Sequence, residues 1–319
     1  MHTHLGLDWA TLIRVPELPE VETIRRQLDP LLRDCSVVDA WAFDSAKFTQ
    51  AHEAVGWQLN GVSRRGKYLL IDLDSLTADP TAEPTAKREL IVHLGMTGRL
   101  SVSNNTGVPS TGAAPTGNSN SWEQSTRANL GDAPALGHLR AIWTLDDGRS
   151  LYFDDVRRFG RIAVVPAGEH DSLATLAALG PEPFDEAFTS EHLRAQVNAS
   201  KRCIKTQLLA QRVVAGLGNI YVDESLWRSQ VHPAAKKITI LQSQKLTEAI
   251  RDVLAAAINN GGTTLRNYRD AEGVAGSNQR YLDCYGRAGQ SCIRCGTTLK
   301  RMVIDARATV FCPNCQRRP

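Results

Sequence analysis

The fold is decided near the amino terminus by the stretch VPELPEVET, residues 15–23. After Pro19, apolar residues recur at helical spacing, and acidic residues occupy the first turn. Proline at the first helical position and acids in the first turn are typical of a helix start. We predict a helix that begins at Pro19, with Pro16 and Glu17 just ahead of its positive end. By pattern alone, this is an ordinary capped helix.

Composition bounds the class of protein. The 319 residues are enough for two domains and a small extra module. A hydrophobic content of 42% and a charged content of 22% are typical of a soluble globular protein. The net charge of +3 permits a nucleic-acid partner without requiring one. We find no apolar run near the roughly 20 residues that span a bilayer, and residues 1–14 do not resemble a signal peptide.

The first half of the chain predicts mainly β structure after its helix. Short apolar strands are expected at Tyr68–Leu73 and Leu90–Leu94. Two more, Ala141–Leu145 and Leu151–Phe153, flank a hairpin turn at Asp146-Asp147-Gly148. We expect two packed sheets over residues 16–166.

Two interruptions of this half have little to bury. Residues 74–87 are rich in Thr, Ala, Asp and Pro, and residues 103–137 are rich in Ser, Asn, Gly, Thr and Pro. Such compositions predict disordered loop insertions, to which we assign no catalytic role.

The second half predicts helices. Residues 167–184 form a linker, and Gly261-Gly262 provides a glycine stop for the last helix. The candidate helices are Glu191–Val197, Ile204–Gln211, Tyr221–Ser229 and Ser243–Asn260.

The cysteines predict a metal site. Two C-x₂-C pairs supply four of the seven cysteines: Cys292, Cys295, Cys312 and Cys315. This is zinc-ribbon spacing, and four thiolates around Zn²⁺ make a closed, structural site. An iron site is the alternative. Metal binding in place of disulfides also suits a reducing cytoplasm.

The segment Gly216–Tyr221 is rich in glycine, but no βαβ pattern surrounds it, so a dinucleotide fold is not expected. Glycines between two helices indicate a helix–turns–helix unit whose helix start can hold phosphate.

Several motifs together resemble the formamidopyrimidine-DNA glycosylases, bacterial enzymes that excise oxidised purines from DNA. They are PELPEVE at 16–22, QRVVAGLGNIYVDESLW at 211–227 and the two cysteine knuckles, in the same chain order. The resemblance spans Pro16 to Gln316. It implies an α+β, multidomain protein: an N-terminal β-sandwich with flanking helices, a helix–two-turn–helix DNA-binding domain at 185–262 and a zinc finger at 277–317.

The resemblance also implies catalytic roles. The free secondary amine of Pro16 would attack C1′ of the damaged nucleotide and form a Schiff base, while Glu17 supplies acid catalysis at the deoxyribose ring. Lys67, in the basic turn 64–67, would bind phosphate and assist β-elimination. Arg307 would grip phosphates and serve the final elimination. As isolated residues, Lys67 and Arg307 fit ordinary solvated charges equally well.

The remaining implied roles concern DNA. Asn219 and Lys205 would hold the phosphates that flank the lesion. Further DNA contacts would come from Lys201, Arg158 and His138, and Met96, Arg157 and Phe159 would fill the gap left by the flipped base. Without the resemblance, the lysines would be surface charges, His138 would be weak evidence, and Met96 and Phe159 would be core residues.

The implied partner is double-stranded damaged DNA. The protein is expected to be a monomer and to work in the cytoplasm, at the nucleoid. One structural zinc ion is expected and no organic cofactor. The loop 267–280, which in the family lies over the flipped base, predicts no particular lesion.

Catalysis by Pro16 requires an unprotonated amine. In the sequence as written Pro16 follows Val15, so its nitrogen is an amide. We expect residues 1–15 to be absent from the mature protein, with Val15 encoded by a GTG start codon and removed as initiator Met. Two alternatives stay open: an endonuclease VIII-type glycosylase for oxidised pyrimidines, against which PELPEVE and Lys205 argue, and a non-catalytic DNA-binding protein.

Overall fold

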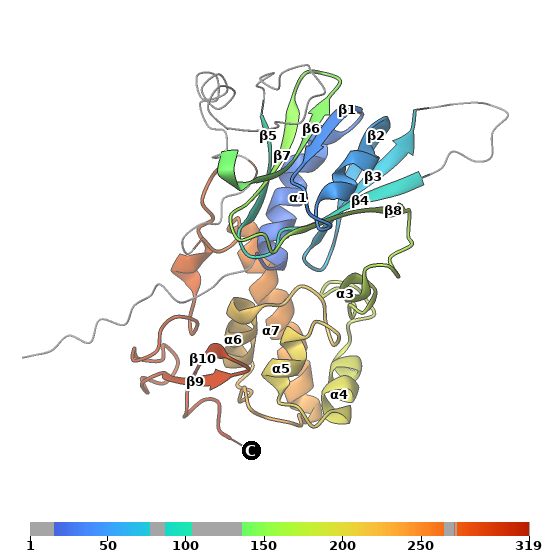
Figure 1. Cartoon of the computed structure of the whole chain (residues 1–319). Coiled ribbons are helices and arrows are strands. Elements are labelled where there is room, and N and C mark those ends of the chain that lie inside the picture. The colour runs from blue at the N-terminus through green and yellow to red at the C-terminus, as the bar shows by residue number, and fades with distance from the viewer. Residues whose placement is uncertain (1–15, 77–86, 104–135, 265–270, 272, 319) are drawn as a thin grey trace, which may run out of the picture.

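The computed structural model describes residues 16–76, 87–103, 136–264, 271 and 273–318. A β-rich half and a helical half are stacked on one another, with a small hairpin beside the helices (Figure 1). Most of the two expected insertions, and part of the loop 267–280, lie outside the described residues. The strands extend into the ends of both insertions by one or two residues.

The first helix, α1 (Leu18–Leu32), begins one residue earlier than predicted, because Glu17 takes the N-cap position. The backbone N–H of Glu17 donates to the Glu20 carboxylate at 2.9 Å. Along its buried stripe, Leu18 belongs to the core of the helical half, whereas the apolar residues from Val21 onward belong to the core of the β half. The first turn of α1 therefore lies where the two halves meet.

The prediction of two packed sheets is confirmed. Both are four-stranded and antiparallel, and their facing side chains form one core with α1. One sheet has the order β1-β6-β7-β5, with strands Val37–Ala42, Leu139–Leu145, Ser150–Asp155 and Gly98–Ser103. The other has the order β2-β3-β4-β8, with strands Trp57–Arg65, Tyr68–Ser75, Lys87–His93 and Arg161–Pro166.

The helical prediction for the second half is also confirmed, with shifted ends. The longer helices are α4 (Ser190–Ala199), α5 (Ile204–Leu209), α6 (Asn219–Arg228) and α7 (Ile240–Asn259). Helix α7 begins three residues early because Thr239 caps it: its hydroxyl accepts from the Gln242 N–H at 3.2 Å. The expected linker contains a short helix, α3 (Ala174–Ala177); its Leu176 and the preceding Leu173 pack on the outer face of the second sheet.

Between the cysteine knuckles the chain forms a hairpin of β9 (Lys300–Ile304) and β10 (Arg307–Phe311). Its two turn residues, Asp305 and Ala306, have φ of 49° and 59°. Short 3₁₀ helices cover Thr49–Ala54, Leu136–His138 and Asn278–Tyr281. Among the described helices, none has the length and apolar character needed to cross a membrane.

Candidate active site

The carboxylate of Glu17 is buried at the start of α6. It accepts backbone N–H groups from Gly218 at 2.7 Å, Ile220 at 3.0 Å and Tyr221 at 3.4 Å. An anion is favoured here because the first N–H groups of a helix lack intrahelical partners. Pro16, immediately before Glu17, is buried with it. The start of α1 is therefore fixed on the start of α6, 201 residues further along the chain.

The glycines of the segment before α6 make this approach possible. A Cβ at Gly218 would lie 2.3 Å from the Glu17 carboxyl carbon. A Cβ at Gly216, whose φ is +85°, would lie 2.4 Å from a Leu18 methyl carbon. The expectation that this helix start holds phosphate is wrong for the three N–H groups that Glu17 occupies. A side chain of the same protein takes the place of the external anion.

Lys67 lies in the turn between β2 and β3, with 8% of its surface exposed. The turn is fastened to the linker by Glu182, which accepts the Gly66 N–H at 2.6 Å and pairs with Arg64 at 2.7 Å and Arg65 at 3.1 Å. The two arginines of this basic turn are thus engaged within the protein, and Lys67 is directed into the interior.

Burial and charge set the protonation of this group of residues. Burial raises the pKa of Glu17, and the charge of Lys67 and the three N–H donors oppose that rise. Burial lowers the pKa of Lys67, against the attraction of Glu17 and Glu20. The pKa of Glu20 is raised to about 7 by burial and by the charge of Glu17. Burial therefore favours the neutral forms of both carboxyls and of the Lys67 amine, which are the forms that acid catalysis and amine chemistry require.

The hairpin β9–β10 brings further predicted residues to α5 and α6. The Ala308 carbonyl accepts from Asn219 Nδ2 at 3.0 Å and from Lys205 Nζ at 3.3 Å. Arg307, next to Ala308, is exposed, and its charge lowers the pKa of both Lys67 and Lys205. The structure therefore groups Glu17, Lys67 and Asn219 with these hairpin residues at the junction of the two halves.

Lys205 differs from the surface charge that the pattern alone allowed. Its side chain is 0% exposed and pairs with Asp223 at 2.6 Å. Burial raises the pKa of Asp223 to about 6 and lowers the pKa of Lys205, and the charge of each residue opposes the pKa shift of the other. Lys201, by contrast, is exposed.

The residues expected to fill the gap left by a flipped base lie on two neighbouring turns. Met96 follows β4 and is half-buried, while Arg157 and Phe159 lie between β7 and β8. Phe159 is 50% exposed, and the Arg157 guanidinium lies 5.1 Å from its ring centroid. The sequence alternative, a core position for Phe159, is therefore wrong.

Asp155 joins these two turns. Its Oδ1 accepts from the Thr97 hydroxyl at 2.5 Å, and its Oδ2 accepts the Gly160 N–H at 2.7 Å. The neighbouring Arg158 is exposed, with φ of 58°. His138, at the end of a 3₁₀ helix, is half-buried.

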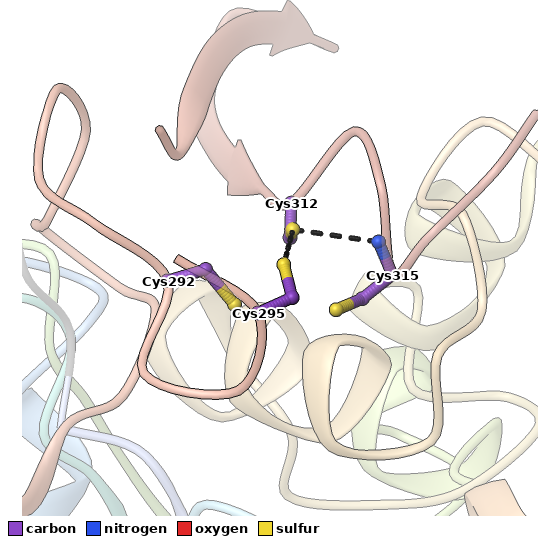
Figure 2. A group of neighbouring side chains, drawn as sticks. All are labelled: Cys292, Cys295, Cys312 and Cys315. Carbon is purple, nitrogen blue, oxygen red and sulfur yellow. Dashed lines mark hydrogen bonds between the residues drawn. The ribbon is translucent and has the colours of Figure 1, made fainter. Parts of the chain in front are cut away.

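The four predicted cysteine ligands converge. Their sulfur atoms lie within 4.8 Å of one another and face a common centre (Figure 2). Cys295 Sγ and Cys312 Sγ are 3.5 Å apart. Four thiolates at this spacing fit a tetrahedral ion, and no other group of this kind is found in the described part of the chain. The protein binds one structural Zn²⁺ here.

Sequence reasoning missed several residues that position this site. Glu182, Glu20 and Asp223 each bind groups that lie far away in sequence, so no local pattern indicated them. His93 was also missed: it pairs across the sheet with Tyr68, the residue after Lys67, and the centroids of the two rings are 4.6 Å apart. Burial, and then the charge of Lys67, lower the pKa of His93 to about 4. Its position three residues before Met96 was the available signal.

Comparisons with known proteins agree along the chain. Three family models match: the formamidopyrimidine-DNA glycosylase N-terminal domain at residues 15–162, the H2TH domain of the same glycosylases at 179–269, and a zinc finger found in FPG and IleRS at 289–318. The formamidopyrimidine-DNA glycosylase of Deinococcus radiodurans is 40% identical over 95% of this chain and 97% of its own length. The formamidopyrimidine-DNA glycosylase of Thermus thermophilus is 37% identical over 95% of this chain and 98% of its own length.

Solved structures show the same likeness. The crystal structure of the MutM (Fpg) protein from Thermus thermophilus has a TM-score of 0.76 and 36% identity over 95% of this chain and 100% of that one. A Lactococcus lactis Fpg mutant bound to Fapy-dG-containing DNA has a TM-score of 0.75 and 30% identity, with the same coverage.

Proposed function

The chain belongs to the formamidopyrimidine-DNA glycosylase family, and we propose that Pro16, Glu17, Lys67 and Arg307 carry out the reaction of that family. The protein is a base-excision repair enzyme that removes oxidised purines from DNA and cleaves the strand at the abasic site. The observation that carries the residue assignment is the buried Glu17 carboxylate, which lies next to Pro16 and acts electrostatically on Lys67.

The reaction begins with an everted nucleotide. The Pro16 nitrogen donates its lone pair to C1′, the bond from C1′ to the base breaks, and the base leaves with the proton that the amine gives up. Glu17 protonates the ring oxygen of the sugar, the ring opens, and an iminium ion forms between Pro16 and C1′. The iminium acidifies the 2′ hydrogen, so that β-elimination breaks the 3′ C–O bond. δ-Elimination then breaks the 5′ C–O bond.

This chemistry needs a free amine at Pro16. We therefore propose that Pro16 is the first residue of the active chain, after start at codon 15 and removal of the initiator residue. Two observations support this: the family model's match begins at residue 15, and relatives cover 95% of this chain but 97 to 100% of their own lengths.

The proposed DNA contacts come from the predicted parts of the chain: the β-sandwich at 16–166, the helix–two-turn–helix domain at 185–262 and the zinc finger at 277–317. Lys201, Arg158 and His138 bind phosphates, and Met96, Arg157 and Phe159 enter the gap left by the flipped base. Exposure of Lys201, Phe159 and both arginines supports this assignment. Work on chromosomal DNA implies a location at the nucleoid.

Glu17→Gln is expected to slow strand nicking by about 10²- to 10⁴-fold, because the amide cannot donate the proton that opens the sugar ring. The measurement is single-turnover nicking by the chain that begins at Pro16, of a duplex with one 8-oxoguanine. Glu191→Gln, at an exposed position of α4, is the control and should react at the unaltered rate. A Glu17→Gln rate within threefold of the unaltered rate contradicts the role.

Substrate class has its own test. Incubated with matched duplexes, the chain that begins at Pro16 is expected to nick the 8-oxoguanine strand and to leave the thymine glycol strand largely intact. Denaturing gels resolve the two products. Faster cleavage of the thymine glycol duplex would favour an endonuclease VIII-type enzyme.

A further inference from the structure

The buried pair of Lys205 and Asp223 lies beneath the hairpin that carries Arg307, and the reaction above gives Asp223 no part. Both side chains are 0% exposed. Asp223 Oδ1 accepts from Lys205 Nζ at 2.6 Å, and Asp223 Oδ2 accepts the backbone N–H of Val310 at 2.9 Å. The two oxygens of one carboxylate thus join α5 to β10.

The hairpin is held at a second point two residues earlier. There the Ala308 carbonyl accepts from Lys205 Nζ and Asn219 Nδ2. Arg307 precedes this anchored carbonyl directly, and its guanidinium is exposed. The backbone that sets the direction of Arg307 therefore depends on Asp223 in two ways: directly through Val310, and indirectly through the ammonium that holds Ala308.

We infer that Asp223 is a positioning residue for the last elimination step, acting through the hairpin on Arg307. This inference rests on the role proposed for Arg307. A buried ammonium without its counter-charge is strongly disfavoured, so without the Asp223 charge Lys205 either loses its proton or turns toward solvent. An amide at position 223 also offers one acceptor oxygen to two donors.

A purely structural role for Asp223 predicts something different. Its loss would lower the melting temperature, but molecules that remain folded would process DNA normally. A positioning role predicts that folded, zinc-loaded molecules still release the base, yet stop more often after β-elimination. The ratio of β to δ products on a denaturing gel separates the two explanations.

The test compares Asp223→Asn with Asp252→Asn in the chain that begins at Pro16. Asp252, on α7, has a 56% exposed side chain paired with Arg228, so its replacement makes the same change in charge away from the hairpin. We expect Asp223→Asn to slow δ-elimination by about 10- to 100-fold, the scale of a misplaced catalytic group. Base release by the same variant, and both steps in Asp252→Asn, should stay within threefold of the unaltered protein.

A double-mutant cycle with Arg307→Ala makes the test specific. If Asp223 acts through Arg307, adding Asp223→Asn to Arg307→Ala should slow δ-elimination no further. If the two substitutions instead slow δ-elimination independently, so that their effects multiply, the inference is overturned.

If Asp223→Asn alone fails to fold, the double variant Asp223→Asn with Lys205→Met leaves no buried unpaired charge and should show the same defect in δ-elimination. An unchanged β to δ ratio in a folded, zinc-loaded Asp223 variant also overturns the inference. If the unaltered protein cannot nick DNA, the proposed function fails instead.

Discussion

A chain that begins at Pro16 is expected to cleave 8-oxoguanine duplex at least about 10³-fold faster than the chain of residues 1–319, the scale of losing a catalytic nucleophile. The reason is the nitrogen of Pro16. Behind Val15 it is an amide, whose lone pair is delocalised into the carbonyl, whereas at the terminus it is a secondary amine. The environment suits that amine, because the Glu17 carboxyl beside it is buried and its pKa is raised.

Both chains share all the side chains of the site, so a difference between them isolates the amine. Single-turnover nicking at saturating DNA is the measurement, with intact mass confirming the terminus of each chain. Acetylation of the Pro16 amine in the shorter chain is the control and should abolish cleavage again. Full-rate cleavage by a chain proven to retain residues 1–15 would refute the prediction.

Zinc removal is expected to have the second-largest effect: loss of strand cleavage by about 10²-fold or more, with recovery on adding Zn²⁺. The apolar cluster of the finger is small: it contains Cys292 and Cys312 and relies on Trp227 of α6. Structural zinc contributes about 10–16 kcal/mol of apparent binding free energy in small fingers, so the hairpin is not expected to hold its place without it. If the hairpin leaves its place, the site loses Arg307 and also the Ala308 carbonyl, to which the Asn219 side chain donates.

Cys312→Ser tests the same dependence without a chelator. Its matched control is Cys35→Ser, since Cys35 is also buried but lies in the β half, where its Sγ is 3.1 Å from Arg149. In Cys312→Ser, the zinc content, measured with a colorimetric chelator, and the nicking rate should fall together. In Cys35→Ser, neither should fall. The β-sandwich has a separate core and should remain folded. A zinc-free protein that nicks at full rate would contradict this dependence.

Local patterns in the sequence were sufficient for the elements and the metal site. The Asp146-Asp147-Gly148 turn, with Gly148 at φ 85°, and the cysteine spacing each depend on a few neighbouring residues, and both predictions are confirmed. The order of strands in the two sheets was not predictable, because β1 pairs with β6 and β4 with β8 across long intervening segments.

The positioning residues were not predictable for the same reason. In the sequence, Glu182 is a single acid between two prolines in a linker. In the structure it holds the turn of Lys67 by accepting the N–H of Gly66, 116 residues away in the chain. The N–H groups at the start of α6 suggested a phosphate site, and only the fold shows that Glu17 fills it. The catalytic roles themselves came from resemblance to a known family, since an isolated Pro-Glu pair indicates no chemistry.

The most direct test of the account is to locate the covalent bond. The chain that begins at Pro16 is reacted with 8-oxoguanine duplex in the presence of borohydride, and the trapped adduct is digested and sequenced by mass spectrometry. Lys67 is the rival amine, because it is buried near Glu17 and its pKa is lowered. We expect the sugar remnant to be attached to the Pro16 nitrogen. Attachment to Lys67 Nζ, or the absence of any adduct from a protein that still cleaves DNA, would contradict it.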